Sequence, residues 1–346
     1  MAPHLRTVIL TVGMALAAAA AMPAAAQDSA QQRAWCNDAN NTYSLDLQIG
    51  GCTALIQSGT LGTTDLAVAF YNRGNAYYAQ KDYPRAIADY SEAIRLNPQY
   101  AFAFNNRGIV YKAQKDYPRA IADYSEAIRL NPQYALAFYN RGSAYDDLKD
   151  YPRAITDYSE TIRINPQYAA AFNNRGIVYK AQKDYPRAIA DYSEAIRLNP
   201  QYAFAFNNRG LIYEAQKDYP RAIADYSEAI RLNPQYAFAF NNRGNVYKAQ
   251  KDYPRAIADY SEAIRINPQD AKVFRNRGKL ELVQQRWQDA WNDYDAALRL
   301  EPGIARALYG RGVAARRLGR TTEGDRDVAR AVALDPTVAE EFTEIR

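Results

Sequence analysis

Residues 105–134 read NNRGIVYKAQKDYPRAIADYSEAIRLNPQY, and the same thirty residues occur unchanged at 173–202. Near-copies follow at 207–236 and 241–270. A catalytic pocket depends on unique residues and gains nothing from copies of one segment, whereas a surface that is read along its length does gain. The repetition therefore indicates that the chain builds an extended surface.

The copies belong to a period of 34 residues that runs through most of the 346-residue chain. Glycine recurs at this step at Gly74, Gly108, Gly142, Gly176, Gly210, Gly244, Gly278 and Gly312. Proline recurs at the same step at Pro98, Pro132, Pro166, Pro200, Pro234, Pro268, Pro302 and Pro336. A fixed period of this length, without insertions, predicts a stack of supersecondary units, each of which buries its apolar face against the next.

Each unit carries the pattern of two short helices. With Ala101 as position 1 of a unit, apolar residues recur every three to four residues in two separate stripes, which is the period of a helix. Asp116 lies between the stripes as a good N-cap, and Pro118 lies near the start of the second helix, where its missing N–H costs little. The second helix ends at Asn131, because the residue before Pro132 is pushed out of helical geometry. Helices this short need packing within the stack to be stable.

The small, aromatic and proline positions of the unit carry a family resemblance. They are Phe104, Gly108, Tyr111, Ala120, Tyr124, Ala127 and Pro132. Their types and spacing resemble the signature of the tetratricopeptide repeat (TPR). The resemblance implies an all-α protein, a right-handed α-solenoid of eight 34-residue helix-turn-helix units. Glu281, Gly324 and Val328 depart from the signature in the last two units, where looser stacking or different capping is expected.

The period also predicts the organisation of the chain. Eight units are expected over 67–338, at 67–100, 101–134, 135–168, 169–202, 203–236, 237–270, 271–304 and 305–338. Residues 27–66 are expected to form a degenerate N-terminal cap, with a second helix at 45–59 and a loop in GTLGTTD at 59–65. Residues 339–346 are expected to form a short, partial capping helix, which shields the last apolar face of a solenoid.

Residues 1–26 resemble a cleavable secretory signal peptide. Arg6 supplies the positive charge, the apolar run TVILTVGMALAAAAA spans 7–21, and Ala24 and Ala26 fit a cleavage site after Ala26. The run is a poor permanent membrane helix, although an uncleaved N-terminal anchor is the alternative. The mature protein is therefore expected in a bacterial periplasm or secreted. It would have no integral membrane segment once the signal is removed, and association with an outer membrane stays open.

The two cysteines, Cys36 and Cys52, lie sixteen residues apart. In unit numbering this is the separation between positions 8 and 24, which face each other where paired helices touch. A disulfide between them would hold the degenerate cap together, in keeping with an oxidising compartment. A redox-active pair is the alternative, but the sequence has no C-x-x-C spacing and no neighbouring histidine.

The sequence offers few of the residues and motifs that catalysis needs. The only histidine is His4, within the expected signal, so no imidazole base, Ser-His-Asp set or histidine-ligated metal site is expected, and no cofactor motif is present. Arginine stands at position 7 of every unit and aspartate at position 23, which predicts a structural ladder of ion pairs between helices. The net charge of +5 does not require a nucleic-acid partner. We therefore expect a protein that is not an enzyme and binds no cofactor.

The resemblance implies a concave groove lined by first helices, with positions 2, 5, 6, 9, 12 and 13 facing into it. Asparagine, which can bond the backbone of an extended peptide without reading its side chains, stands at positions 5 and 6. These candidates are Asn72, Asn105, Asn106, Asn140, Asn173, Asn174, Asn207, Asn208, Asn241, Asn242 and Asn276. Lys112, Lys180 and Lys248 at position 12 alternate with Asp146 and Glu214, and are expected to give selectivity. The alternative is that all of these are solvated faces left by recent duplication.

The function favoured by the sequence is a non-enzymatic scaffold or adaptor in the cell envelope. It would bind an extended peptide or the surface of a protein partner in the groove. A structural spacer without a specific ligand is one alternative, and an accessory role in polysaccharide assembly or export is another. RNA binding is disfavoured by the secretion signal and by the small net charge.

Overall fold

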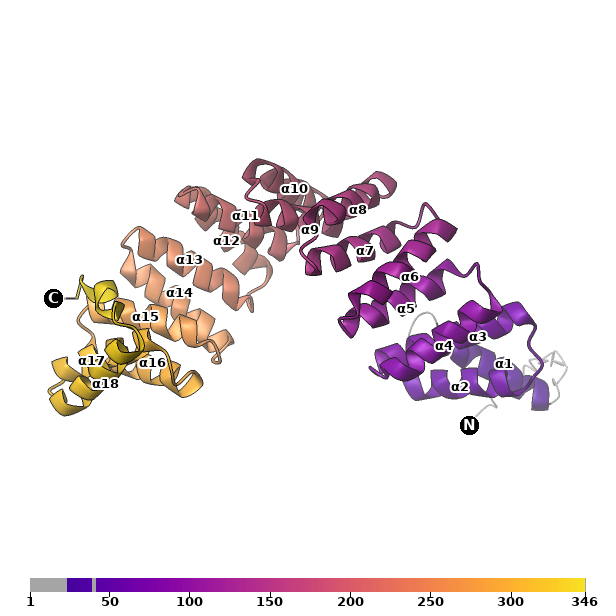
Figure 1. The fold of residues 1–346 in the computed structure, drawn as a ribbon, viewed down its shortest axis with the longest axis horizontal. Coiled ribbons are helices and arrows are strands. Elements are labelled where there is room, and N and C mark those ends of the chain that lie inside the picture. The colour runs from indigo at the N-terminus through magenta and orange to yellow at the C-terminus, as the bar shows by residue number, and fades with distance from the viewer. Residues whose placement is uncertain (1–23, 39–41, 346) are drawn as a thin grey trace, which may run out of the picture. The chain divides into compact units, whose positions relative to one another are not determined.

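The computed structural model describes residues 24–38 and 42–345. The predicted signal segment therefore lies almost wholly outside the described residues. The described chain is all-α, as predicted, and its eighteen α-helices are arranged in pairs (Figure 1). The pairs are α1 (Ala24–Cys36) and α2 (Leu45–Gln57), α3 (Thr63–Ala79) and α4 (Tyr83–Leu96), α5 (Ala101–Ala113) and α6 (Tyr117–Leu130), α7 (Ala135–Asp147) and α8 (Tyr151–Ile164), α9 (Ala169–Ala181) and α10 (Tyr185–Leu198), α11 (Ala203–Ala215) and α12 (Tyr219–Leu232), α13 (Ala237–Ala249) and α14 (Tyr253–Ile266), α15 (Ala271–Val283) and α16 (Trp287–Leu300), and α17 (Ala305–Arg317) and α18 (Thr321–Leu334).

The chain divides into two compact units, Met1–Pro132 and Gln133–Arg346. The first contains α1 to α6, and the second contains α7 to α18 and the 3₁₀ helix η1 (Val338–Phe342). Within each unit, each helix pair packs against the next. No helix in the described ranges is long and apolar enough to cross a membrane.

The turn between the two helices of a repeat is set by local chemistry. In the repeat that begins at Ala169, Lys183 adopts a left-handed backbone with φ of 61°. This lets the backbone N–H of Asp184 reach the carbonyl of Tyr179 at 2.9 Å. The side chain of Asp184 then accepts a hydrogen bond from the N–H of Arg187 at 3.2 Å and caps α10, as the sequence predicts.

The core of every repeat except the last is a tyrosine packed on a glycine. Tyr192 is fully buried, and a Cβ atom added to Gly176 would lie 2.8 Å from its Cε1 atom. The ring therefore occupies the space that any larger residue at position 8 would need. The glycine period in the sequence records this close approach between the two helices.

The predicted arginine–aspartate ladder is confirmed. Arg175 of α9 donates from Nε and Nη2 to the carboxylate of Asp191 on α10, at 2.9 and 2.8 Å. Its Nη1 also donates to the hydroxyl of Ser159 on α8, at 2.9 Å. One guanidinium thus joins the two helices of its own repeat to the second helix of the preceding repeat.

First helices form the inner layer of the stack. Within the second unit, α7 contacts α9, α9 contacts α11, α11 contacts α13, and α15 contacts α17. In the first unit, α3 contacts α5 in the same way. Successive second helices make no comparable contact in the described ranges. Successive first helices therefore lie closer together than successive second helices. The side of each first helix that points away from its second helix lines the inner face of the unit.

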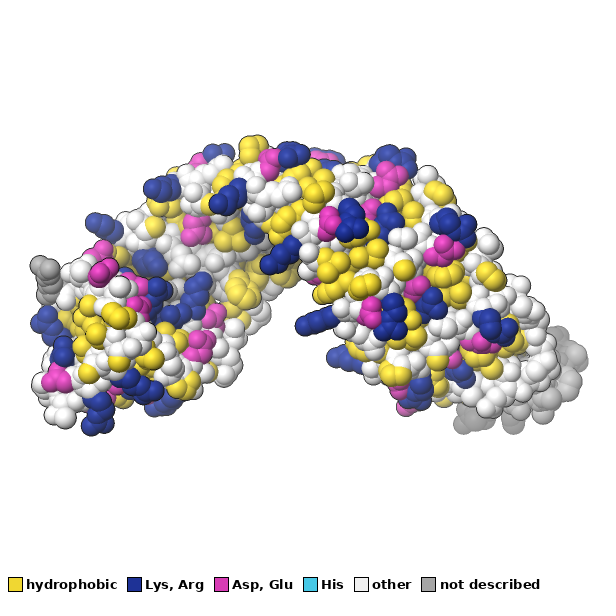
Figure 2. Space-filling model, viewed as in Figure 1, with side chains coloured by type: hydrophobic (Ala, Val, Ile, Leu, Met, Phe, Trp, Pro, Cys, Tyr) yellow, Lys and Arg dark blue, Asp and Glu magenta, His cyan; other side chains and the backbone are white. Residues whose placement is uncertain are grey.

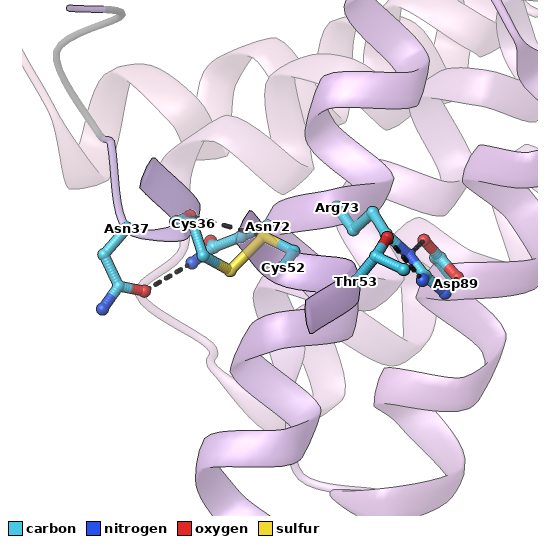
Figure 3. Close-up of a disulfide and its surroundings, with 7 residues drawn as sticks. All are labelled: Cys36, Asn37, Cys52, Thr53, Asn72, Arg73 and Asp89. Atoms are coloured by element: carbon cyan, nitrogen blue, oxygen red, sulfur yellow. Dashed lines mark hydrogen bonds and ion pairs between the residues drawn. A yellow bond between two sulfur atoms is a disulfide. The ribbon is translucent and has the colours of Figure 1, made fainter. Parts of the chain in front are cut away.

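The N-terminal pair is joined by a disulfide between Cys36 and Cys52, with an S–S distance of 2.10 Å (Figure 3). Both cysteines are buried. Asn37, directly after Cys36, accepts a hydrogen bond from Asn72 of α3 at 3.0 Å. The helix α3 begins at Thr63, inside the segment that the sequence assigns to a loop. This first helix is longer than the others because no asparagine–proline turn precedes it.

The C-terminal segment differs from the predicted helix at 339–346. It forms the 3₁₀ helix η1, with i→i+3 bonds such as that from the N–H of Glu340 to the carbonyl of Thr337 at 3.0 Å. Phe342 is buried, with ring centroids 4.9 Å from Tyr309 and 6.5 Å from Tyr294. It covers the end of the core, and residue 346 lies outside the described residues.

Candidate functional site

The differences between near-identical repeats fall on the first helices. The second helices α4, α6, α10 and α12 share one sequence, YPRAIADYSEAIRL. The first helices differ chiefly at positions 2, 9 and 12 of the 34-residue repeat. These positions hold Phe102, Ile109 and Lys112; Leu136, Ser143 and Asp146; Ala170, Ile177 and Lys180; Phe204, Leu211 and Glu214; and Phe238, Asn245 and Lys248. Within each compact unit, we refer to the side chains at these positions as its first-helix face.

The first-helix face is accessible. Phe204 and Phe238 are 52% and 61% exposed, and the residues at positions 9 and 12 are half-buried. Hydrophobic side chains lie among charged ones on the surface in view (Figure 2). Exposed aromatic side chains beside half-buried charges, as on the first-helix face, suit a protein surface better than a small polar ligand.

The position-5 asparagines are not part of the accessible face, and their prediction as groove contacts is wrong. Asn105, Asn173, Asn207 and Asn241 are all buried. Asn207 accepts a hydrogen bond from Asn242 of the next repeat at 3.0 Å, and Asn173 accepts one from Asn208 at 3.2 Å. Burial at the contact between first helices leaves these amides no access to a ligand.

The position-6 asparagines are half-buried, and their amides donate hydrogen bonds within the protein. Asn174 and Asn106 donate to the hydroxyls of Tyr139 and Tyr71, at 2.9 and 3.0 Å, where tyrosine replaces asparagine at position 5. Asn276 donates to Asn241 at 3.4 Å. Asn72 donates to Asn37 of the cap, and Asn140 is half-buried at the same position. These hydrogen bonds therefore join each repeat to the preceding one. The sequence signal for them was the recurrence of asparagine or tyrosine partners 35 residues apart.

Position 12 carries alternating charges along the second unit, at Asp146, Lys180, Glu214 and Lys248. Burial lowers the pKa of Lys180, and burial together with Lys279 lowers the pKa of Lys248. Burial raises the pKa of Glu214, whose carboxylate accepts a hydrogen bond from the Tyr226 hydroxyl at 2.7 Å. Lys180 and Lys248 form no ion pair with any described residue. Lys112 occupies the same position in the first unit, where it is half-buried.

The repeats match models of a known family. Models described as "Tetratricopeptide repeat" match residues 101–134, 135–168 and 237–270, and residues 173–237 and 275–339. A model described as "TPR repeat" matches 74–115. The chain belongs to the tetratricopeptide repeat family. No curated protein gives a significant match to the TPR chain.

Several solved structures have a similar TPR fold. A tetratricopeptide repeat protein from Parabacteroides merdae ATCC 43184 has a TM-score of 0.55 and 20% identity, over 74% of this chain and 98% of that chain. Pseudomonas aeruginosa pilF has a TM-score of 0.54 and 19% identity, over 60% of this chain and 95% of its own. A chain of the APC/C hetero-tetramer Cut9–Hcn1 has a TM-score of 0.55 and 15% identity, over 84% of this chain and 53% of its own. At these identities the similarity shows the fold alone.

An aromatic row at one edge of the TPR stack adds residues that the sequence reading missed. Tyr202 and Phe204 lie edge to face at 6.4 Å, Phe204 and Tyr236 at 5.0 Å, and Tyr236 and Phe238 at 6.3 Å. The phenylalanines were expected as apolar contacts, whereas the tyrosines at position 34 were not. Their signal was the Tyr-Ala-Phe at 100–102, 202–204 and 236–238, where three of the first helices begin.

The TPR fold also forms a pocket of about 360 Å³ between α1, α2 and α3, lined by Gln48, Tyr71, Asn72 and Asn75 among others. Its polar groups are amides, the Tyr71 phenol and the Asp38 carboxylate, which accepts hydrogen bonds from the backbone N–H of Tyr43 at 2.7 Å and from the Gln48 amide at 3.2 Å. Within the described residues, no three cysteine, histidine, aspartate or glutamate side chains are placed to hold a metal ion. The arrangement is suited to binding.

Proposed function

We propose that this TPR protein is a non-enzymatic scaffold or adaptor that binds a protein partner across the first-helix face. The observation that carries the proposal is where the repeats differ. Four second helices are identical and most of the buried framework is copied, while positions 2, 9 and 12, which are exposed or half-buried, vary from copy to copy. Variation concentrated on one accessible face is expected of a surface that reads an extended peptide or a partner surface along its length.

We also propose that the protein works in the cell envelope, in a periplasm or secreted, after removal of residues 1–26. The charged and apolar pattern of that segment supports this, as does the buried disulfide of the cap at 27–66. Association with an outer membrane belongs to the same proposal. The eight repeats at 67–338 would then form the working part of the mature protein.

The proposal is tested by affinity capture from an envelope extract with the full chain as bait. The first-helix variant is Lys180→Ala, Phe204→Ala and Phe238→Ala, all at exposed or half-buried positions outside the core. The matched control is Arg163→Ala, Arg197→Ala and Arg231→Ala, which removes three exposed arginines from second helices. Circular dichroism must show equal helicity for all three proteins.

The proposal expects a partner that the wild type and the control capture and that the first-helix variant does not. Equal capture by both variants would place binding elsewhere and contradict it. If the wild type captures no partner at all, the chain is better described as a structural spacer.

A further inference from the structure

A cluster of lysines surrounds a pocket on the first-helix face near the C-terminal end. The pocket has a volume of about 280 Å³ and is lined by Lys248 of α13, Lys251, and Lys279 of α15. Tyr253, Leu280 and Val283 supply its apolar walls, and Glu344 lies at its edge. None of the three lysines forms an ion pair with a described residue.

The pocket carries more positive charge than the acidic groups around it neutralise. Burial lowers the pKa of Lys248, and the positive charges of Lys279 and Lys272 lower it further, while the negative charge of Glu214 raises it. Three lysines and one glutamate, Glu344, therefore line the pocket, while Lys272 and Glu214 act on Lys248 from outside its lining. Like charges gathered at a concave surface raise the local positive potential and attract anions.

The chain's own C-terminal segment shows which chemistry this surface accepts. Glu341 forms an ion pair with Arg306 of α17 at 2.5 Å. Phe342 packs on Tyr309, with the Lys279 ammonium 5.9 Å from its ring centroid. The segment then places Glu344 at the edge of the lysine pocket. An acidic segment with an aromatic anchor thus lies on the faces of α15 and α17, next to the pocket.

We propose that the lysine pocket binds an acidic peptide segment of a partner protein, whose carboxylates lie between Lys248 and Lys279. This inference rests on the proposed function, and it names the chemistry of the partner at one end of the first-helix face. The apolar walls and the neighbouring acidic segment favour a peptide over a bare anion. Ammonium–carboxylate contacts in a partly buried site are stronger than those on an open surface.

The test is fluorescence anisotropy with the full chain and a labelled octaglutamate peptide, with octaglutamine as the neutral probe. The pocket variant is Lys248→Gln with Lys251→Gln. The matched control is Lys183→Gln with Lys217→Gln, which removes two exposed lysines from the same turn position as Lys251 in two other repeats, outside the first-helix face. Glutamine already occupies the left-handed position as Gln285, with φ of 57°, so both variants should fold.

The proposal expects the wild type and the control to bind octaglutamate within about twofold of each other, and the pocket variant to bind about tenfold more weakly. Octaglutamine should bind none of the proteins. Equal losses in both variants would mean a diffuse field and overturn the assignment. Displacement of the peptide by inorganic phosphate at constant ionic strength would also overturn it, in favour of a simple anion site.

The two proposals fail in different ways. If the first-helix variant loses its partner but the wild type does not bind octaglutamate, only the lysine pocket is wrongly assigned. If octaglutamate binds as expected but no partner depends on the first-helix face, the pocket stands and the wider scaffold proposal fails.

Discussion

At the scale of single residues, Gly176 and Tyr192 show how closely the two helices of a repeat are packed. The ring of Tyr192 lies against the backbone of α9, so the smallest side-chain addition meets it at 2.8 Å. The same pairing recurs with Gly210 and Tyr226. Such contacts make the glycine a packing requirement, since the interior is close-packed and cannot yield without cost.

Gly176→Ala should therefore lower the free energy of unfolding by about 1–3 kcal/mol through overpacking. Urea unfolding followed by circular dichroism measures this loss. Gly303→Ala is the control, because nothing lies within 4 Å of its added Cβ, and it should change stability by less than about 0.5 kcal/mol. Equal effects of the two substitutions would contradict the packing argument.

Glu214 gives a pH dependence of known sign. Burial raises its pKa above the ordinary value, so its contribution to stability is complete below the unfolded pKa of about 4.3 and is lost as the pH rises through the folded value. Glu214→Gln, which cannot ionise, should be more stable than the wild type at pH 7, and this gain should shrink towards pH 4.

Urea unfolding at both pH values measures the difference. Glu228→Gln is a control of opposite sign, because the hydrogen bonds from Arg231 lower the pKa of Glu228. That contribution is present above the unfolded pKa and is lost as the pH falls. A gain for Glu214→Gln that does not change with pH would exclude ionisation as its cause.

At the scale of helices, Arg175 holds three elements together. It bonds Asp191 and Ser159, and the pair is mostly buried, with the Arg175 side chain 19% and the Asp191 side chain 7% exposed. Removal of one partner leaves a buried charge without compensation. The exposed pair of Arg197 and Glu194 lies within one helix and has no such role.

Arg175→Ala should cost about 3 kcal/mol of stability. Arg197→Ala should cost less than about 1 kcal/mol, because exposed pairs contribute little. Hydrogen exchange measured by mass spectrometry should show that Arg175→Ala loosens α8, α9 and α10 first. Similar costs for both substitutions would show that the buried ladder adds nothing to stacking.

The disulfide should act on the cap alone. Replacement of Cys36 and Cys52 by serine should remove about 3 kcal/mol of stability from the N-terminal pair, since the bond closes a loop across a separation of 16 residues. Hydrogen exchange should then rise in α1, α2 and the start of α3. Unchanged exchange there would mean that packing, not the bond, holds the cap.

The sequence predicts most of the helical framework because its signals are local. The period, the caps such as Asp184 and the glycine–tyrosine spacing each follow from chemistry within one 34-residue repeat. The asparagine row was misread, because whether Asn207 faces a ligand or the next repeat depends on how first helices stack. The 3₁₀ form of η1 depends in the same way on packing against neighbouring helices, which a single repeat does not contain. The early start of α3 follows instead from the lack of an asparagine–proline turn before it.

At the scale of the molecule, each of the two units is a stack of nearest-neighbour contacts. A copied framework carries the stability, and the first-helix face carries the differences between copies. Binding energy on such a face should be concentrated at exposed aromatic residues, such as Phe204 and Phe238, and at the partly buried charges beside them.

The most direct test is photo-crosslinking, with benzoylphenylalanine at Phe204 on a first helix or at Arg197 on a second helix. Phe204 belongs to the variable exposed face, and Arg197 is exposed on the copied one. The account predicts that a partner protein is crosslinked from position 204 and not from position 197. Crosslinking from position 197 alone would contradict the claim that the first-helix face binds the partner.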